Sequence, residues 1–149
     1  MLLNASEISS RLVSDLRLGL PVILYDGEQI VLAAAIETLS SEKLEKINQI
    51  TKSKKFEIAI TNRRAKVLNV RIYNEEVTRL SIEEKIDLHL LHAIADPSKD
   101  LDYPLKGPFQ SERDGNFDIA SLSLSLCKKA RLLPALILVD ISNLSLIHI

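Results

Sequence analysis

Two histidines, His89 and His92, lie three residues apart in a segment whose apolar residues recur at helical spacing. Imidazoles at that spacing can share one face of a helix and coordinate a metal ion, and Asp96 follows shortly after them. The sequence offers no third ligand at a diagnostic spacing and no HExxH pattern. We therefore expect surface or partly buried helix positions for both histidines rather than a metal site.

Three carboxylates, Glu83, Glu84 and Asp87, precede the histidines and could serve as general acids or bases. The same residues stand where the helix is expected to begin, and negative charge is favourable at a helix N-terminus. The sequence therefore favours a structural role for them.

The single cysteine, Cys127, lies among leucines with Lys128 beside it. A thiol with a lowered pKa could act as a nucleophile, but a buried and inert thiol is the simpler interpretation. One cysteine also excludes an internal disulfide and a zinc site built from cysteines of this chain. Such cysteine usage is typical of the reducing cytoplasm, where we expect the protein to be located.

Five basic side chains could hold a phosphorylated ligand: Lys52, Lys54, Lys55, Arg63 and Arg64. Short basic runs are usually solvated turns, and the first turn of a predicted helix is an ordinary place for exposed arginines. The GxGxxG, P-loop and GxSxG patterns are missing, and the chain has only four glycines. From the residue patterns alone, no active site is predicted.

The composition indicates one globular domain with a core of aliphatic side chains. The 149 residues are 46% hydrophobic but only 4% aromatic, and they include no tryptophan. With 19 basic and 20 acidic residues, the chain has no global field that would attract nucleic acid or an acidic membrane. No apolar run reaches the roughly 20 residues that span a bilayer, and the first residues do not have the pattern of a secretory signal.

These candidate residues must be positioned by helices and strands, and the clearest local signal is a hairpin within residues 16–37. A helix that starts at an Asn4 or Ser6 cap ends at Gly19, and Pro21 then opens an apolar strand. An Asp-Gly turn at residues 26–29 joins this strand to a second apolar strand. The turn is too short to hold a catalytic loop.

The rest of the chain alternates between helical and strand-like patterns. The predicted helices are 40–50, 61–68, 82–95 and 117–131; the predicted strands are 56–60, 70–73, 77–82 and 136–141; and 97–116 is a long loop. In residues 117–131, alternating leucines and serines suggest a strand, but an apolar stripe from Phe117 to Ala130 at helical spacing favours a helix. The expected fold class is α/β (α+β), with three layers: a mixed, twisted sheet with helices on both faces.

Several segments, taken together, resemble 3,4-dihydroxy-2-butanone-4-phosphate synthase, an enzyme of riboflavin biosynthesis. The matching segments are 16–22, 33–37, 91–97, 107–109 and 132–137. Each segment is short, but their order and spacing are similar to those of the family up to about Asn143. The resemblance implies the synthase fold.

The resemblance also implies that the catalytic machinery of the family is missing. The family has an acidic loop that binds magnesium and substrate where this chain has only residues 26–29. Its TGxS segment falls near 80–83 and its Gly-His-Thr-Glu signature on 118–121, so the metal-binding histidine is absent. Magnesium then has no evident site. We therefore assign no catalytic, cofactor-binding or metal-binding residues.

A retained scaffold without its site is similar to the N-terminal domain of certain bacterial GTP cyclohydrolase II proteins. This resemblance implies a longer parent protein whose C-terminal cyclohydrolase domain, with zinc and with GTP as substrate, is missing from this sequence. The expected partners are a second copy in a homodimer and that domain, with no nucleic acid and no membrane.

The C-terminal residues 144–149 are expected to be a non-native tail, which leaves 1–143 as the synthase-like domain. They are what the codons CTG-TCT-CTT-ATA-CAC-ATC encode, which match a transposon mosaic end used in preparing sequencing libraries. His148 is then discounted as a ligand. The alternative is a genuine apolar strand at this end.

Three functional hypotheses follow. The leading one is a non-catalytic scaffolding or dimerisation domain of a GTP cyclohydrolase II-type protein. The second is a divergent synthase that acts on ribulose 5-phosphate through other carboxylates, such as Asp26, Glu28 and Glu37. The third is a module that binds a phosphorylated ligand through the five basic side chains named above.

Overall fold

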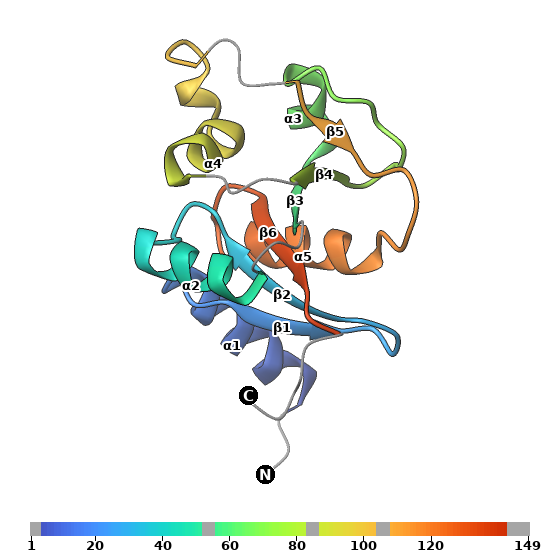
Figure 1. Cartoon of the computed structure of the whole chain (residues 1–149). Helices are drawn as coiled ribbons and strands as arrows, with labels where there is room; N and C mark the ends of the chain where they lie inside the picture. The colour runs from blue at the N-terminus through green and yellow to red at the C-terminus, as the bar shows by residue number, and fades with distance from the viewer. Residues whose placement is uncertain (1–3, 52–55, 83–86, 104–107, 143–149) are drawn as a thin grey trace.

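The computed structural model describes residues 4–51, 56–82, 87–103 and 108–142 (Figure 1). The elements, in chain order, are α1 (Ala5–Arg17), β1 (Val22–Tyr25), β2 (Ile30–Ala35), α2 (Ser41–Thr51), β3 (Phe56–Ile60), α3 (Asn62–Val67), β4 (Thr78–Ile82), α4 (Leu88–Ala95), the 3-10 helix η1 (Pro97–Lys99), β5 (Gln110–Ser111), α5 (Asp118–Lys129) and β6 (Ala135–Asp140).

The six strands form one sheet in the order β1-β2-β6-β3-β4-β5. The last strand of the chain, β6, lies in the interior of the sheet between β2 and β3. Its residues 135–139 are all buried, as the apolar pattern predicts. Every described pair of neighbouring strands is antiparallel, so strand direction is more uniform than in the mixed sheet that was expected.

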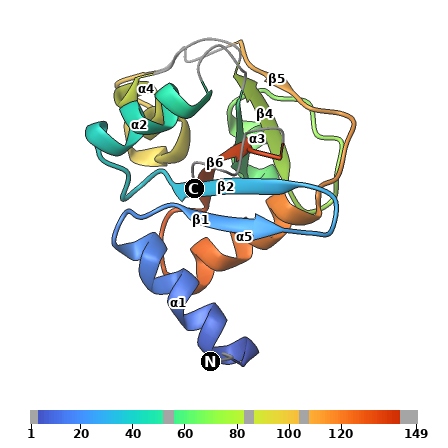
Figure 2. The same cartoon turned by 60° about the horizontal axis from the view of Figure 1, so that its bottom comes forward.

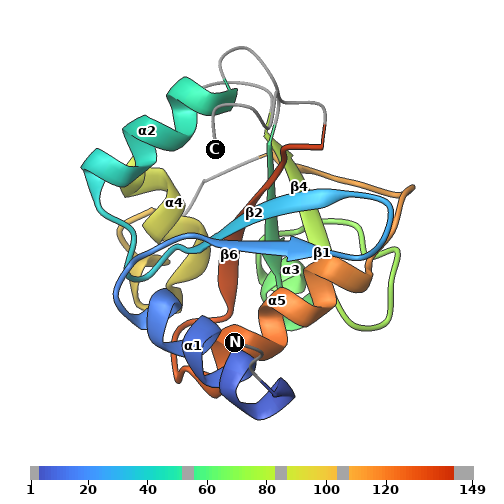
Figure 3. The ribbon, with the colours of Figure 1, turned by 90° about the horizontal axis from the view of Figure 1, so that it is seen from below.

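Helices cover both faces of this sheet, which confirms the three-layer arrangement. Figure 3 shows α1 and α5 on one side of the strands and α2 and α4 on the other. Leu16 of α1 and Leu124 of α5 belong to the core on the first face, and Leu44 of α2 and Ile94 of α4 belong to the core on the second. Burial of these apolar stripes against the sheet is the main stabilising term of the fold. None of the helices in the described ranges has the length and apolar character that crossing a membrane requires.

The hairpin of β1 and β2 is confirmed. Val22 lies opposite Ala33, and Tyr25 lies opposite Ile30. In the turn, one carboxylate oxygen of Asp26 accepts hydrogen bonds from the backbone N–H groups of Glu28 and Gln29, both at 2.9 Å. The bonds from Gln29 and then Glu28 favour the charged carboxylate and lower the pKa of Asp26 below its usual value.

The helix starts follow the capping residues of the sequence. Asn4 caps α1, Thr61 caps α3 and Asp87 caps α4 through side-chain oxygens that accept backbone N–H groups. Asp87 therefore has the structural role that was expected of it. The helix predicted over 82–95 begins later, at Leu88, because Ile82 pairs with Phe56 in the sheet.

Two other predictions differ from the structure. Residues 70–73 were expected to form a strand but do not, because β4 already has β3 on one side and β5 on the other. The hydroxyl of Ser111 in β5 instead donates to the carbonyl of Arg71 at 2.6 Å. The predicted loop 97–116 contains η1 and β5. The helix interpretation of 117–131 is confirmed by α5.

Several predicted features fall outside the described residues. They are the lysines of 52–55, the carboxylates Glu83 and Glu84, and the tail 144–149 with His148.

Candidate functional site

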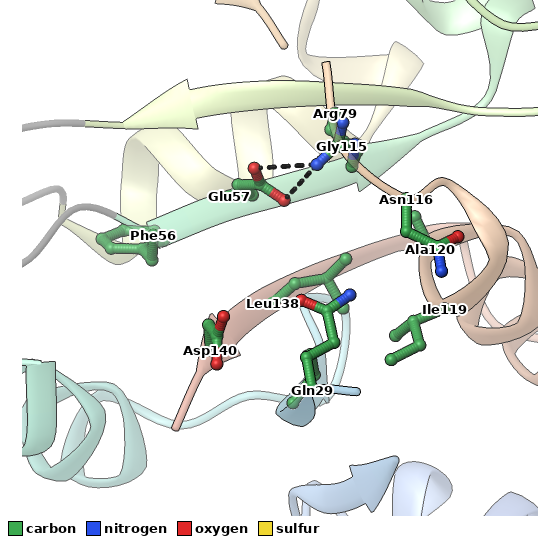
Figure 4. A pocket seen from close by; sticks show the side chains of 11 residues that line it. Gln29, Phe56, Glu57, Arg79, Gly115, Asn116, Ile119, Ala120, Leu138 and Asp140 are labelled. Carbon is green, nitrogen blue, oxygen red and sulfur yellow. Dashed lines mark hydrogen bonds and ion pairs between the residues drawn. The ribbon is translucent and has the colours of Figure 1, made fainter. Parts of the chain in front are cut away.

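A cleft of about 250 Å³ opens on the α1 and α5 face of the sheet, beside the N-terminus of α5 (Figure 4). Strands β2, β3, β4 and β6 contribute to it, together with the loop before α5. Its lining residues are Gln29, Val31, Phe56, Glu57, Arg79, Gly115, Asn116, Ile119, Ala120, Leu138 and Asp140. Apolar side chains and a few polar groups therefore converge in one concave place, which is the usual composition of a ligand site.

The guanidinium of Arg79 occupies one wall of the cleft. Its side chain is only 8% exposed, and Nη1 lies 3.1 and 3.3 Å from the two carboxylate oxygens of Glu57 (Figure 4). Nη2 donates to the carbonyl of Asp114, and the guanidinium carbon lies 4.3 Å from the centre of the Phe117 ring. Charge-assisted hydrogen bonds and stacking on an aromatic face are the two interactions that arginine makes best.

The loop before α5 closes over this arginine. A Cβ built on Gly115 would lie 3.3 Å from Nη2 of Arg79, and this glycine has a φ of +96°. Glycine is therefore favoured at this position by both the close approach and the backbone conformation.

Within the described part of the chain, Nε of Arg79 is buried without a hydrogen-bond partner. The wall of the cleft is therefore tightly packed but contains one hydrogen-bond donor without an acceptor.

The rim of the cleft is tied together by the hairpin turn and the loop. Asn116 donates from Nδ2 to the second carboxylate oxygen of Asp26 at 3.0 Å, and its own side-chain oxygen accepts from the N–H of Asp118 at 2.7 Å. On the other side, Asp140 accepts from the N–H of Ser142 at 2.9 Å. The short turn therefore acts as a structural tie to the start of α5.

The carboxylates proposed for a divergent synthase do not come together. Asp26 and Glu28 lie in the turn before β2, whereas Glu37 follows β2 and accepts from the N–H of Leu133 at 2.9 Å. The six residues of β2 lie between the turn and Glu37, and an extended strand of that length spans about 20 Å. Glu37 therefore cannot share a metal ion with the other two.

The histidines occupy the positions that were expected of them. His89 is exposed and His92 is half-buried on α4, beside a wide cavity of about 740 Å³. Asp96 caps η1 by accepting from the N–H of Ser98 at 2.9 Å, and this bond is the main cause that lowers the pKa of Asp96. Among the described residues, no group of three or more His, Cys, Asp or Glu side chains is placed to hold a metal ion.

One of the two arginines expected to be exposed is buried. Arg64 is 8% exposed and forms a salt bridge with Asp100 at 2.7 Å. Its Nε and Nη2 donate to the carbonyls of Ile94 and Ala93 at 2.7 and 3.0 Å, near the end of α4. Arg64 therefore binds the chain itself and is not free for a phosphate, whereas Arg63 is exposed.

Cys127 is fully buried on α5, and burial raises the pKa of its thiol to about 12. The thiolate needed for nucleophilic attack is then disfavoured, which agrees with the inert interpretation.

Sequence reasoning missed the residues that meet in the cleft. Glu57, Arg79 and Asp140 are far apart in the chain; the strands of Glu57 and Asp140 are otherwise apolar, and the strand of Arg79 alternates between polar and apolar residues. Glu57 and Arg79 also belong to the strand face that packs against α5, since Ala59 and Val77 are in that core. A charged residue at an inward position of a strand is the signal that could have found them.

Comparisons with known proteins identify the fold at low sequence identity. No family model matches the chain, and no curated protein matches its sequence. Among solved structures, it is similar to RibBX, a two-domain 3,4-dihydroxy-2-butanone 4-phosphate synthase from A. baumannii. The TM-score is 0.64 and the identity 19%, over 89% of this chain and 47% of that one. The chain thus spans about half the length of that protein.

Two further structures give the same result. The synthase of Candida albicans matches with a TM-score of 0.59 and 15% identity, over 87% of this chain and 76% of that one. A synthase in complex with two magnesium ions matches with a TM-score of 0.60 and 14% identity, over 88% of this chain and 74% of that one. This chain therefore has a 3,4-dihydroxy-2-butanone-4-phosphate-synthase-like fold, with a six-stranded sheet and helices on both of its faces.

Proposed function

We propose that this chain is a non-catalytic domain that supports a larger riboflavin-biosynthesis protein of the GTP cyclohydrolase II type. The observation that carries the proposal is the ion pair of Arg79 and Glu57 in the cleft. The chain's own groups occupy the polar wall where a ligand would have to bind.

The ion pair opposes the chemistry that a magnesium-dependent synthase needs. Magnesium prefers carboxylate oxygens and waters in octahedral geometry. Both carboxylate oxygens of Glu57 face a guanidinium, which cannot be deprotonated and would repel a cation beside it. The described residues of the cleft therefore do not fit a magnesium ion.

Arg79 does not offer an accessible phosphate site either, because its side chain is only 8% exposed and its unpartnered Nε is buried. Nη1 and Nη2 already donate to Glu57 and to the carbonyl of Asp114, and the face of the guanidinium lies on Phe117. A sugar phosphate would have to break these contacts before it could bind. A supporting role for a partner domain agrees better with this packing than does turnover.

The comparison with a two-domain protein supports the idea of a partner domain. The chain spans 47% of the length of the two-domain A. baumannii protein, although that relative is called a synthase. The GTP cyclohydrolase II parent and its C-terminal domain, with zinc and with GTP as substrate, are part of this proposal. Sequencing the gene beyond codon 143 tests the parent directly, because a cyclohydrolase half either follows or does not.

The non-catalytic claim is tested by incubating the chain with ribulose 5-phosphate and magnesium. A magnesium-dependent synthase of the same fold, assayed in parallel, is the positive control. We expect no 3,4-dihydroxy-2-butanone 4-phosphate above the level of a protein-free blank. Turnover that requires both magnesium and the folded chain would refute the proposal.

A further inference from the structure

Another cavity, wider than the candidate cleft, lies on the opposite face of the sheet. Figures 2 and 3 show α2 and α4 on this side of the strands, with α1 and α5 on the other side. The cavity has a volume of about 740 Å³, and α2, α4, η1 and the residues that follow η1 contribute to it. Six of the described side chains that line it can form hydrogen bonds: Ser41, His89, His92, Lys99, Asp102 and Tyr103.

The packing of α4 places its two histidines at this cavity. Leu91 and Ile94 belong to the buried core on this face, and Leu88 packs against that core. His89 directly follows Leu88, and His92 directly follows Leu91. Because residues three apart lie on one side of a helix, the core holds α4 so that both imidazoles border the same space.

His92 has a ring nitrogen without a partner at this cavity. Within the described residues, its Nε2 is buried and forms no hydrogen bond. Buried polar side-chain atoms in proteins nearly always have a hydrogen-bond partner. When Nε2 carries the proton, an oxygen of a ligand in the cavity would supply the missing acceptor.

The cavity is rich in hydrogen-bond donors. Lys99 contributes an exposed ammonium group, and each imidazole contributes one donor when it is neutral and two when it is charged. Tyr103 and Ser41 contribute hydroxyl groups. Ser41 is also the first residue of α2, where the helix dipole is favourable for negative charge.

Carboxylates are fewer than donors around this space. Asp102 is the one carboxylate among the described lining residues, and Asp96 interacts electrostatically with Lys99 from the start of η1. The other acidic residues near the starts of these helices, Glu42 and Asp87, do not line the cavity. The balance of the lining groups therefore favours an anion with several acceptor oxygens.

We propose that this cavity binds the phosphate group of a small organic phosphate, through His89, His92 and Lys99. A phosphate group directs strong acceptor oxygens to several sides, so it can accept from two imidazoles and an ammonium group together. The volume is far larger than a phosphate group needs and is within the range of small-molecule sites, so the rest of the ligand would lie against Leu88 and Tyr103.

This inference goes beyond the proposed function, which concerns the cleft on the other face of the sheet. The three residues also differ from the five basic side chains that the sequence suggested for a phosphorylated ligand. A metal ion is a weaker candidate for the cavity. The described residues place no third ligand with His89 and His92, and the charge of Lys99 would repel a cation.

Binding is measured by proton NMR of the imidazole C–H signals in the full chain. The three histidines, His89, His92 and His148, can be assigned with the variants His89→Gln, His92→Gln and His148→Gln. Titration with AMP should shift the signals of His89 and His92 with a dissociation constant of about 1 mM or lower. Adenosine, which lacks the phosphate group, should leave them in place.

Three results of this titration would overturn the proposal: unchanged signals of His89 and His92, shifts confined to His148, or equal shifts with adenosine. Inorganic phosphate and ribose 5-phosphate are titrated in the same way. Equal affinities for all three phosphates would support recognition of the phosphate group alone. Tighter binding of one organic phosphate would support the site and show which body it accepts.

The role of Lys99 is tested with Lys99→Gln, a change on an exposed side chain. It should raise the dissociation constant for AMP by about three- to tenfold, because one charge-assisted contact with the phosphate is lost. Lys128→Gln is the matched control, since Lys128 is exposed on α5 at the other face and the net charge changes equally. Equal effects of the two variants would reduce the binding to a general charge effect and overturn the site.

The role of the histidines is tested with sulfate at constant ionic strength, because sulfate carries the same charge at pH 5.5 and pH 7.5. Protonation adds positive charge to the imidazoles, so sulfate should bind more tightly at the lower pH. The double variant His89→Gln, His92→Gln should lose this pH dependence, and thermal unfolding checks that it is folded. Affinity of the wild-type chain that does not change with pH would contradict the assignment of the two histidines.

Discussion

Arg79 and Glu57 illustrate how two charged residues on strands can pair with each other in the wall of a cleft instead of binding a ligand. Arg79 is nearly buried and Glu57 is 26% exposed, so the pair is only partly screened by water. Removing one partner of such a pair leaves the other charge without compensation. The contribution of this ion pair to the stability of the fold can therefore be measured by replacing one of the two residues.

Glu57→Gln should destabilise the fold by about 1–3 kcal/mol, because Arg79 loses its anionic partner while its surroundings stay buried. Urea unfolding with fixed m-values measures the change. Glu75→Gln, on an exposed residue, is the matched control and should change stability by less than about 0.5 kcal/mol. Equal stabilities of the two variants would show that the ion pair does not contribute to the free energy of unfolding.

Cys127 gives a second test at the residue scale. Its thiol has an ordinary pKa of 9.0 when the chain is unfolded and about 12 when it is folded. The unfolded chain therefore loses the proton first, so folding stability should fall as pH rises from about 9 toward 12. Replacement by alanine should remove this part of the alkaline dependence.

Alkylation measures the same burial directly. At pH 8 the folded chain should react with iodoacetamide far more slowly than the urea-unfolded chain, which serves as its control because Cys127 is the single cysteine. Equal rates in the two states would show that the thiol is accessible.

At the scale of elements, Arg64 connects α3 to the end of α4. Its guanidinium satisfies the carbonyls of Ala93 and Ile94, which lie in the last turn of α4 and lack helical partners there. The salt bridge with Asp100, the residue directly after η1, connects a third segment to Arg64. One buried side chain thus fixes the relative position of three segments.

Arg64→Ala should therefore destabilise the fold by about 2–4 kcal/mol, because the carbonyls of Ala93 and Ile94 lose their donor and Asp100 loses its salt bridge with Arg64. Arg64→Lys should recover only a small part, since an ammonium group cannot reproduce the planar, multidentate contacts. Arg63→Ala, on the exposed neighbour, is the control and should be nearly neutral in thermal unfolding. A neutral Arg64→Ala would contradict the structural role of this residue.

The sequence predicted those elements whose signals are local. Caps at Asn4 and Thr61 and the Asp-Gly turn act within a few residues of themselves, so their effects are visible in the chain. Residues 70–73 have a strand-like pattern, but the side of β4 away from β3 is already paired with the distant β5. The pattern of 70–73 was therefore not enough to predict whether the segment would join the sheet.

The candidate cleft could not be predicted for the same reason. Gln29, Glu57, Arg79, Asn116 and Asp140 come together only when β6 is inserted between β2 and β3. The sequence did indicate that the hairpin turn is too short for a metal-binding loop. The structure shows in addition that this turn is bonded to the loop before α5, which no local pattern could reveal.

At the scale of the whole molecule, the chain combines a synthase-like fold with a cleft whose polar wall is held by an internal ion pair.

The most direct test of the central claim is a single-turnover experiment with the chain and ribulose 5-phosphate at equal concentrations in excess magnesium. Under these conditions even a very slow enzyme converts its bound substrate, and NMR follows every carbon-bound proton of the sugar phosphate. The proposed function predicts a spectrum that stays identical to the protein-free control. Signals of 3,4-dihydroxy-2-butanone 4-phosphate that grow only with folded protein would contradict it.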